Sequence, residues 1–222
     1  MNSTLPIVER FHSLQGEGIH FGKSAFFIRI GGCKVGCPWC DTKESWPENH
    51  HQKETVSQLS KEVAIAQSKG AAILVLTGGE PLHHNLNPLC EAIINTTASQ
   101  NNKSIPIHLE TSGVNELSGT INWITLSPKR HSSPQKSILR DCHEIKVVIH
   151  QTEDLIFAES MAQQAMKEKQ ESVEEGKQCV KPALFLQPGW ESIEGKELAI
   201  EYIKSHPKWR LSLQTHKWLG VL

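Results

Sequence analysis

The chain lacks an excess of charge of either sign. Its 222 residues include 23 Lys and Arg against 24 Asp and Glu, which gives a formal net charge of −1. Proteins that bind nucleic acid through its phosphates usually carry a basic excess, so we expect no direct nucleic-acid contact. The sequence also lacks the run of about 18 apolar residues that a membrane helix needs. These absences argue against a general nucleic-acid binder and a membrane-spanning protein.

A secretion signal is also missing, because the opening residues MNSTLPIVERF contain no basic segment followed by an apolar one. We therefore expect a cytoplasmic protein whose thiols are reduced. The content of 38% hydrophobic and 21% charged residues is typical of a globular protein. The length predicts a single domain over residues 1–222.

Short apolar runs rich in β-branched residues predict strands that are buried on both faces. These runs are residues 25–30, 73–76, 105–109, 123–126, 144–149, 183–186 and 209–213. Helical spacing and capping residues predict four helices, which begin near Thr55, Leu86, Thr152 and Glu194. The polar stretch 167–176 is expected to be a solvated helix end or a loop.

Alternating strands and helices are typical of a parallel α/β sheet. Two connections, 110–122 and 127–143, show little helical periodicity. A complete eight-fold barrel needs about 250 residues, which is more than this chain has. We therefore predict an α/β fold that is a partial, modified TIM-type barrel, with parallel strands and some helices reduced or missing.

Polar motifs follow several of the predicted strands at the point where each strand ends. These motifs are the cysteine loop 33–40, TGGEP at 77–81, ETSG at 110–113, SPK at 127–129, QP at 187–188 and QTHK at 214–217. In parallel α/β folds, ligands bind beyond the carboxyl ends of the strands. We expect these motifs to converge on one site.

The cysteines fall into two groups. Cys33, Cys37 and Cys40 have the spacing CxxxCxxC, which suits a compact metal centre. A structural zinc site would need a fourth ligand, for which Asp41 or a distant histidine is available. A 4Fe–4S cluster held by three cysteines leaves one iron open, and an open iron suggests catalysis. The other cysteines are isolated and are expected to be small core residues: Cys90, Cys142 and Cys179.

The CxxxCxxC loop and the later Gly-Gly-Glu segment resemble the radical S-adenosylmethionine (SAM) superfamily. Gly-Gly-Glu alone would be an ordinary turn, so the cysteine spacing is the stronger signal. The resemblance implies that the amino and carboxylate groups of SAM chelate the open iron. It also implies that an electron from the cluster cleaves SAM to methionine and a 5′-deoxyadenosyl radical.

Longer motifs resemble one family within this superfamily, 7-carboxy-7-deazaguanine synthase. They run in order along nearly the whole chain: FHSLQGEG at 11–18, FIR at 27–29, CDT at 40–42, Trp46, and the TGGEP, ETSG, SPK and QTHK motifs. The family, by this resemblance, converts 6-carboxy-5,6,7,8-tetrahydropterin to 7-carboxy-7-deazaguanine with loss of ammonia, in queuosine biosynthesis. Hydrogen is taken from C6 of the pterin and later returned, so SAM is regenerated. The resemblance further implies a homodimer, Mg²⁺ and an electron donor such as flavodoxin.

The resemblance assigns residues to both sides of the site. The substrate contacts would be Leu14, Gln15, Gly16, Glu17, Arg29, Thr77 and His216. The SAM contacts would be Gly78, Gly79, Glu80, Glu110, Ser127, Pro128, Lys129, Gln187, Pro188, Gly189 and Trp190. Thr42 would bind Mg²⁺, which prefers oxygen ligands. No side chain is assigned as an acid or a base, because the radical carries the chemistry.

Two of these roles have simple alternatives. Arg29 offers a planar cationic fork that suits a carboxylate, but a structural ion pair explains an arginine in an apolar strand almost as well. The carboxylate of Leu222 is a further candidate for a substrate contact. Two other functions stay open: a different small radical SAM enzyme, such as a glycyl-radical activator, and a zinc-binding interaction module.

Overall fold

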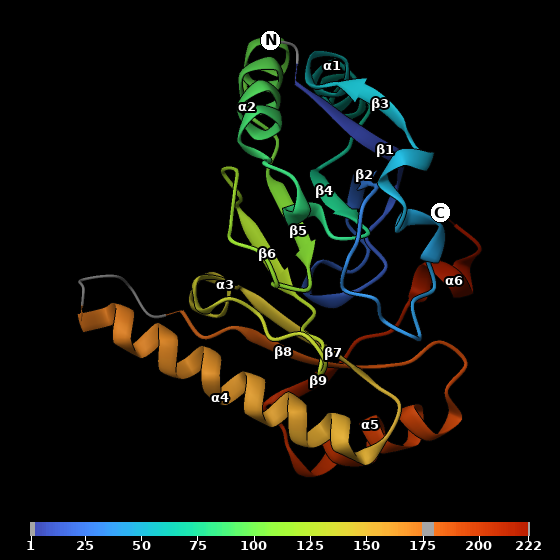
Figure 1. Cartoon of the computed structure of the whole chain (residues 1–222), viewed down its shortest axis with the longest axis vertical. Coiled ribbons are helices and arrows are strands. Elements are labelled where there is room, and N and C mark those ends of the chain that lie inside the picture. The colour runs from blue at the N-terminus through green and yellow to red at the C-terminus, as the bar shows by residue number, and fades with distance from the viewer. Residues whose placement is uncertain (1–2, 175–179, 222) are drawn as a thin grey trace.

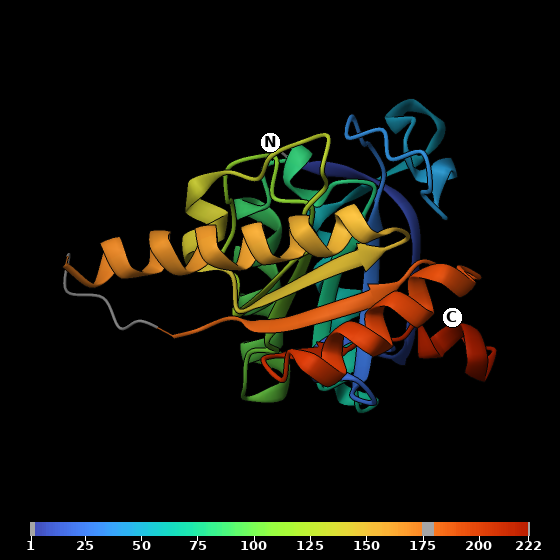
Figure 2. The same cartoon turned by 90° about the horizontal axis from the view of Figure 1, so that it is seen from below.

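Nine strands form one sheet in the computed structural model, which describes residues 3–174 and 180–221. The order across the sheet is β3-β1-β2-β4-β5-β6-β7-β8-β9, and within the described residues the edge strands β3 and β9 do not pair. The strands are β1 (Thr4–Leu14), β2 (Ser24–Ile30), β3 (Gln52–Thr55), β4 (Ile73–Gly78), β5 (Ile107–Thr111), β6 (Trp123–Leu126), β7 (Glu144–Ile149), β8 (Ala183–Pro188) and β9 (Trp209–Leu211). The predicted partial barrel is confirmed as an unclosed, curved sheet (Figures 1 and 2).

In the order across the sheet, each strand from β2 to β9 is parallel to its neighbour. Strand β3 is not part of this run, since it lies at the edge beyond β1. All seven predicted strands are confirmed, with β5 displaced two residues toward the C-terminus. The sequence did not predict β1 and β3, which pair antiparallel with their neighbours. Both are rich in polar residues and occupy one border of the sheet, so apolar runs did not mark them.

The helices are α1 (Val56–Ser68), α2 (Asn87–Asn101), α3 (Lys136–Asp141), α4 (Thr152–Glu174), α5 (Ile193–Ser205) and α6 (Thr215–Leu219). The four predicted helices are confirmed, and α3 and α6 were not predicted because both are short. Helix α4 continues to Glu174 through the polar stretch, where Lys169 donates a 2.7 Å hydrogen bond to the carbonyl of Arg140 in α3. No helix among the described residues is long and apolar enough to cross a membrane.

The two faces of the sheet differ in chemistry. The outer face packs against α1–α5 and holds the main core, to which β7 contributes Ile145, Val147 and Ile149. Lys146, between Ile145 and Val147, points to the opposite face and lines the larger cavity, because successive side chains of a strand alternate faces. The sequence predicted parallel strands that are apolar on both faces. In the structure they carry polar side chains on their inner face.

The isolated cysteines in the described chain are core residues, as predicted. Cys90 and Cys142 are buried, and burial raises their pKa values to about 11 and 12. None of the described cysteines is in a disulfide. Cys179 and Leu222 lie outside the described residues, so the expectations for them are not addressed.

Candidate active site

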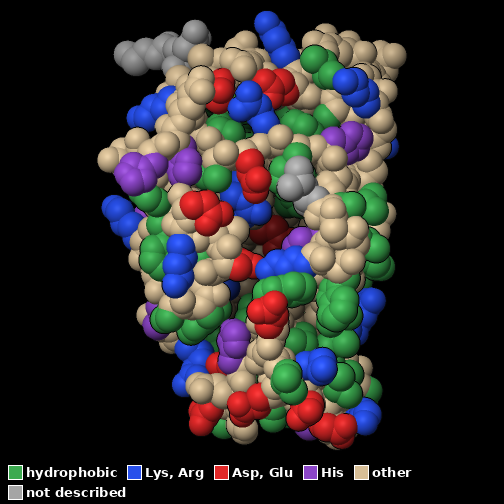
Figure 3. Space-filling model, turned by 90° about the vertical axis from the view of Figure 1, so that its right-hand side faces the viewer, with side chains coloured by type: hydrophobic (Ala, Val, Ile, Leu, Met, Phe, Trp, Pro, Cys, Tyr) green, Lys and Arg blue, Asp and Glu red, His purple; other side chains and the backbone are tan. Residues whose placement is uncertain are grey.

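Two adjoining cavities open where the parallel strands end. The larger one, about 420 Å³, takes lining residues from the cysteine loop and from the segments after β4, β5, β6, β7 and β8. The smaller one, about 280 Å³, lies between β1, β2, β4 and the segment that includes α6. Glu17, Arg29, Thr42, Thr77 and Glu110 line both cavities. Figure 3 shows this side of the molecule, hollowed near its middle with acidic side chains inside.

The cavities bring together nearly all the residues that the sequence indicated. The larger cavity collects Cys33, Cys37, Cys40, Gly78, Gly79, Ser127, Lys129, Gln187, Pro188, Gly189 and Trp190. The smaller cavity collects Leu14, Gln15, Gly16 and His216. Glu80 and Pro128 line neither cavity. Most of the expected cofactor residues thus line the larger cavity, and the expected substrate residues line the smaller cavity or the border that the two cavities share.

Glu80 is buried just behind the wall of the larger cavity. Its carboxylate accepts hydrogen bonds from Thr111 Oγ1 at 2.6 Å, from the Ser112 N–H at 2.8 Å and from the Leu82 N–H at 3.1 Å. These bonds join the end of β4 to the end of β5. In the structure Glu80 therefore holds the wall together, and its contact with an ammonium group stays a prediction.

The cysteine loop folds tightly against the end of β4. The Cys33 N–H donates to the Trp46 carbonyl at 3.1 Å, which closes the loop. A Cβ atom at Gly79 would lie 2.6 Å from the Gly32 carbonyl oxygen and 2.8 Å from Cys33 Cβ. Only glycine allows this approach, so the Gly-Gly-Glu segment and the cysteine loop fit each other.

The three loop thiols are free and face the larger cavity. Burial raises the pKa values of Cys33 and Cys37, although nearby Lys129 lowers that of Cys37. Among residues 3–174 and 180–221, no three His, Cys, Asp or Glu side chains converge closely enough to bind one metal ion. A 4Fe–4S cluster takes each thiolate on a different iron.

Lys129 and His150 add polar groups to the larger cavity. Lys129 Nζ donates to Ser127 Oγ at 2.8 Å, and burial lowers its pKa while Cys37 raises it. His150 Nε2 is buried and has no hydrogen-bond partner among the described residues. An unpaired buried nitrogen in a cavity wall is a natural contact for a polar ligand.

The smaller cavity combines an aromatic wall with polar edges. The rings of Phe11 and Phe27 stack with their centroids 5.0 Å apart, and both line the cavity. Gly16 lies under His216, where a Cβ would be 2.4 Å from the imidazole Nδ1. The Gly16 carbonyl accepts a 2.6 Å hydrogen bond from Thr215 Oγ1, which fixes α6 against the segment after β1. A flat, polar molecule suits such walls.

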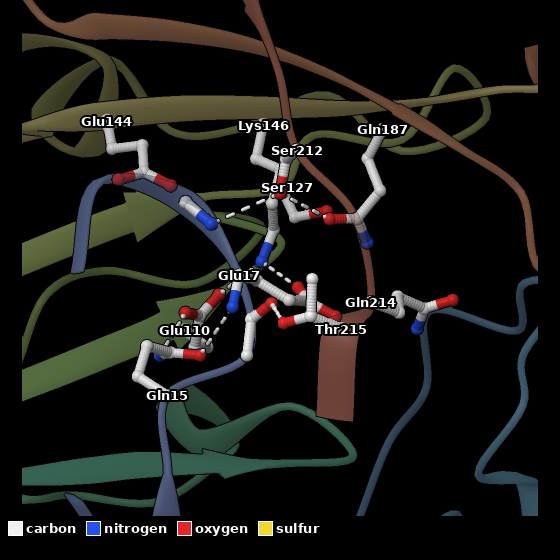
Figure 4. A network of polar contacts seen from close by, with 12 residues as sticks. Gln15, Glu17, Glu110, Ser127, Glu144, Lys146, Gln187, Ser212, Gln214 and Thr215 are labelled. Carbon is white, nitrogen blue, oxygen red and sulfur yellow. Dashed lines mark hydrogen bonds and ion pairs between the residues drawn. The ribbon is translucent and has the colours of Figure 1, made fainter. Parts of the chain in front are cut away.

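A charged cluster of Glu17, Glu110, Glu144 and Lys146 lies under both cavities (Figure 4). The Lys146 ammonium donates to Glu17 and, at 3.1 Å, to Glu110, and its side chain is only 5% exposed. Gln15 joins the cluster, since its amide nitrogen donates to Glu110 at 3.4 Å. One buried cation therefore serves two carboxylates that belong to different parts of the site.

The two carboxylates respond differently to this environment. Burial raises the pKa of Glu110 to about 7, because Lys146 only partly offsets it and Glu17 adds repulsion. Burial acts in the same direction on Glu17, but Lys146, with smaller contributions from His216 and Gln187, leaves the pKa below its ordinary value. Burial lowers the pKa of Lys146, yet the surrounding carboxylates raise it above its usual range. Glu17 and Lys146 are therefore both charged at neutral pH.

Arg29 has both of the properties considered from the sequence. It lines both cavities, and its Nε donates to Glu9 at 2.7 Å in an ion pair on the neighbouring strand. The ion pair explains the orientation of the Arg29 side chain. Its position in the cavities is compatible with a contact to a substrate, and that contact stays a prediction. Thr42, the expected Mg²⁺ ligand, also lines both cavities, and its Oγ1 is 3.6 Å from Cys40 Sγ.

Three residues of the site were not assigned a role by sequence reasoning. Lys146 lies in a largely apolar run, and a lysine in such a run was the signal in the sequence that could have indicated a functional residue. Asp41, which was considered only as a zinc ligand, forms an ion pair with Lys217 of α6, whose Nζ lies 2.6 Å from Asp41 Oδ2. His150 follows β7, and its lone position gave no spacing to interpret.

Comparisons with known proteins agree with this geometry. The profile of the radical SAM superfamily matches residues 27–127, which include the cysteine loop and the walls up to Ser127. Together with the unclosed parallel sheet and the thiol-lined cavity, this defines a radical SAM enzyme.

Curated relatives narrow the class. A 7-carboxy-7-deazaguanine synthase of Prochlorococcus marinus is 70% identical over 100% of both chains. One from Synechocystis sp. is 46% identical over 97% of this chain and 93% of its own. The crystal structure of QueE from Escherichia coli superposes with a TM-score of 0.73 at 30% identity, covering 96% of this chain and 95% of that one. The chain belongs to the 7-carboxy-7-deazaguanine synthase family.

Proposed function

We propose that this protein converts 6-carboxy-5,6,7,8-tetrahydropterin to 7-carboxy-7-deazaguanine and ammonia, a step of queuosine biosynthesis. The observation that carries the proposal is the pair of joined cavities, one lined by three free thiols and the other by the aromatic and polar residues of the smaller cavity. A substrate in the second cavity would lie next to the cofactor in the first, because the two cavities share Glu17, Thr77 and Glu110 as lining residues.

The larger cavity fits the cluster and SAM. Cys33, Cys37 and Cys40 would hold a 4Fe–4S cluster, which leaves one iron open for the amino acid part of SAM. When bound, this pair supplies a 5′-deoxyadenosyl radical. The backbone at Gly78 and Gly79 lines the cavity beside the thiols and leaves room for the methionine part. The remaining SAM contacts would be Glu80, Glu110, Ser127, Pro128, Lys129, Gln187, Pro188, Gly189 and Trp190.

The smaller cavity fits a planar pterin with a carboxylate. The stacked Phe11 and Phe27 would contact the flat ring, while Gln15 and Glu17 offer donor and acceptor groups for its edges. Arg29 would bind the carboxylate. Leu14, Gly16, Thr77 and His216 would complete the contacts. Glu17 is charged at neutral pH, so it is an acceptor for N–H groups of the pyrimidinone edge.

Thr42 would bind Mg²⁺ together with oxygen atoms of the substrate, since it lines both cavities. We also propose that the chain is one domain over residues 1–222, that it works as a homodimer in the cytoplasm, and that a donor such as flavodoxin reduces its cluster. The charge balance of the chain supports a small-molecule substrate and no direct contact with nucleic acid.

The deciding experiment is an anaerobic assay of the cluster-loaded protein with the carboxytetrahydropterin, SAM, Mg²⁺ and a reductant. We expect 7-carboxy-7-deazaguanine and ammonia in equal amounts, identified by mass, with SAM not consumed in proportion. Cluster-loaded protein that cleaves SAM but yields no deazaguanine would indicate another radical SAM activity, such as glycyl-radical activation. Stoichiometric zinc without iron or sulfide would indicate the zinc module.

A further inference from the structure

Lys146 is the cation of the charged cluster and contacts residues from both sides of the site. Its ammonium donates to Glu17, which belongs to the predicted substrate contacts, and to Glu110, which belongs to the predicted SAM contacts. Glu17 and Glu110 approach it from different segments, the turn after β1 and the end of strand β5. A single side chain of β7 thus carries the positive charge that both carboxylates share.

The same strand also anchors the segment that carries Glu17. Glu144, two residues before Lys146, accepts a 3.0 Å hydrogen bond from the Ile19 N–H. A Cβ atom at Gly18 would lie 2.0 Å from Glu144 Oε1, so the segment passes directly over this carboxylate. Gly18 N–H donates to Ser212 Oγ at 3.1 Å, and that hydroxyl donates to Gln187 at 2.8 Å. Figure 4 shows these groups on neighbouring elements.

We propose that Lys146 is a positioning residue, which keeps Glu17 ionised and aimed at the pterin while it holds Glu110 at the cofactor side. This inference rests on the proposed function. Lys146 acts through the two carboxylates and not on the reacting atoms.

The physical reason lies in the cost of buried charge. Two neighbouring carboxylates in a buried site repel each other and lose their hydration, so one becomes neutral unless a cation compensates. Removal of Lys146 leaves burial as the dominant influence on the pKa of Glu17, because His216 and Gln187 lower that pKa less than Lys146 does. A protonated Glu17 can no longer accept two N–H groups from the pterin edge, because one of its oxygens has become a donor.

Other charged and polar groups also face Glu17 and set the background for its titration. His216 approaches from α6, Gln187 from β8, and Glu110 from β5, and His216 and Gln187 lower the pKa of Glu17 less than Lys146 does. Glu144 lies on the same strand as Lys146 and contributes to the pKa of that lysine. None of these groups replaces the lysine, because Lys146 has the largest favourable effect on Glu17.

The test compares the wild type with Lys146→Met, both cluster-loaded, by anaerobic equilibrium titration with the pterin in the presence of SAM and Mg²⁺. At neutral pH we expect the methionine variant to bind the pterin roughly tenfold or more weakly, since each unit of pKa change alters the ionised fraction up to tenfold. The loss should shrink as the pH is raised, because alkali ionises Glu17 again. Recovery at high pH separates a charge effect from damage to packing.

Lys169→Met is the matched control. Lys169 is also a buried lysine, but it donates to a backbone carbonyl of α3, away from both cavities. We expect this variant to lose stability and to keep wild-type pterin affinity at every pH. In the background of Glu17→Gln, Lys146→Met should add little further loss of affinity, because the group through which it acts is already neutral.

Two results would overturn the inference while leaving the proposed function intact. One is wild-type pterin affinity in Lys146→Met, and the other is a loss that does not recover at high pH. If the methionine variant does not fold, Lys146→Arg provides the measurement: it retains the cation and should bind pterin without a new pH dependence, and a pH-dependent loss in it counts against the inference. A wild type that binds no pterin contradicts the proposed function itself.

Discussion

The inside of the curved sheet contains two clusters of polar side chains, one of which is charged and the other neutral. Toward the carboxyl ends of the strands, the charged cluster satisfies buried carboxylates with the Lys146 cation. Toward the amino ends lies a ring cluster of His20, His108, Trp123 and His143, with centroids of neighbouring rings 4.4 to 4.9 Å apart. Strand β5 contributes to both, through Glu110 and, two residues earlier, His108.

The ring cluster is neutral. Burial lowers the pKa of His20 to about 4 and that of His108 to about 3, and it also lowers the pKa of His143. His143 Nδ1 accepts a 3.1 Å hydrogen bond from the Ile124 N–H, which requires an unprotonated nitrogen. The rings of this cluster are thus uncharged, whereas the cluster at the cavities contains ionised side chains. We infer that the first end serves ligands and the second serves stability, and substitutions can separate these roles.

The largest difference should come from the thiols above the charged cluster. Cys33→Ala, Cys37→Ala or Cys40→Ala should each abolish SAM cleavage, because a cluster cannot be held by two cysteines. Cys90→Ala, which changes a buried thiol of the core, should retain cleavage. The measurement is 5′-deoxyadenosine formation together with iron and sulfide content. An equal loss in folded Cys90→Ala protein would contradict the assignment of the cluster.

The next effect concerns the ring cluster itself. Trp123→Ala should lower the free energy of unfolding by about 3 kcal/mol, because it removes the ring that contacts both His20 and His143. SAM cleavage per folded molecule should stay close to that of the wild type. Urea denaturation measures the first quantity, with Trp218→Ala as a control that should change stability by no more than about 0.5 kcal/mol, since Trp218 is 78% exposed. Loss of activity in stable Trp123→Ala protein would contradict the inference that the ring cluster contributes to stability and not to function.

A smaller effect is expected at the border of the cavities. Arg29→Ala should weaken pterin binding roughly ten- to hundredfold, because a hydrogen bond between charged groups contributes about 1.5–3 kcal/mol. SAM binding should change much less. Glu9→Gln removes the partner of the ion pair and keeps the guanidinium, so it should leave pterin affinity nearly unchanged. Equal weakening of pterin and SAM binding in Arg29→Ala would assign Arg29 a structural role.

The smallest effect should appear only in acid. A histidine with a folded-state pKa below its ordinary value of 6.5 binds its proton more weakly in the folded chain than in the unfolded chain. Its contribution to stability is therefore complete above about pH 6.5 and is lost as the pH falls toward 3. His108→Gln should lose less stability than the wild type between pH 7 and pH 4.5, as urea midpoints would show. His50→Gln, at an exposed position, should follow the wild type.

The sequence predicted the parallel part of the fold because its outward-facing residues form apolar runs, as Ile145, Val147 and Ile149 do in β7. The same runs concealed Lys146, since a single lysine among them has no meaning until Glu17 and Glu110 are placed beside it. Resemblance to a family indicated those two glutamates separately. Their common partner depends on the register of three distant segments, which neither spacing nor composition reveals.

The border strands and the short helices were not predicted from the sequence, because they carry no clear apolar pattern. Polar residues interrupt the apolar ones in β1 and make up the whole of β3, and α6 has too few residues for a periodic pattern. The convergence of the motifs was predictable, because all parallel strands end at the same edge. The direction of each side chain was not, as Glu80 demonstrates by turning toward Thr111 and Ser112.

The contact of Lys217 with Asp41 has a consequence for the order in which the site is built. Asp41 lies between Cys40 and Thr42, and its partners Lys217 and Gln214 are 176 and 173 residues further along the chain. Contacts between residues so far apart in the sequence form after local structure, because closing a long loop costs conformational entropy. The end of the cysteine loop is therefore fixed at a late step of folding, together with the segment that brings His216 to the smaller cavity.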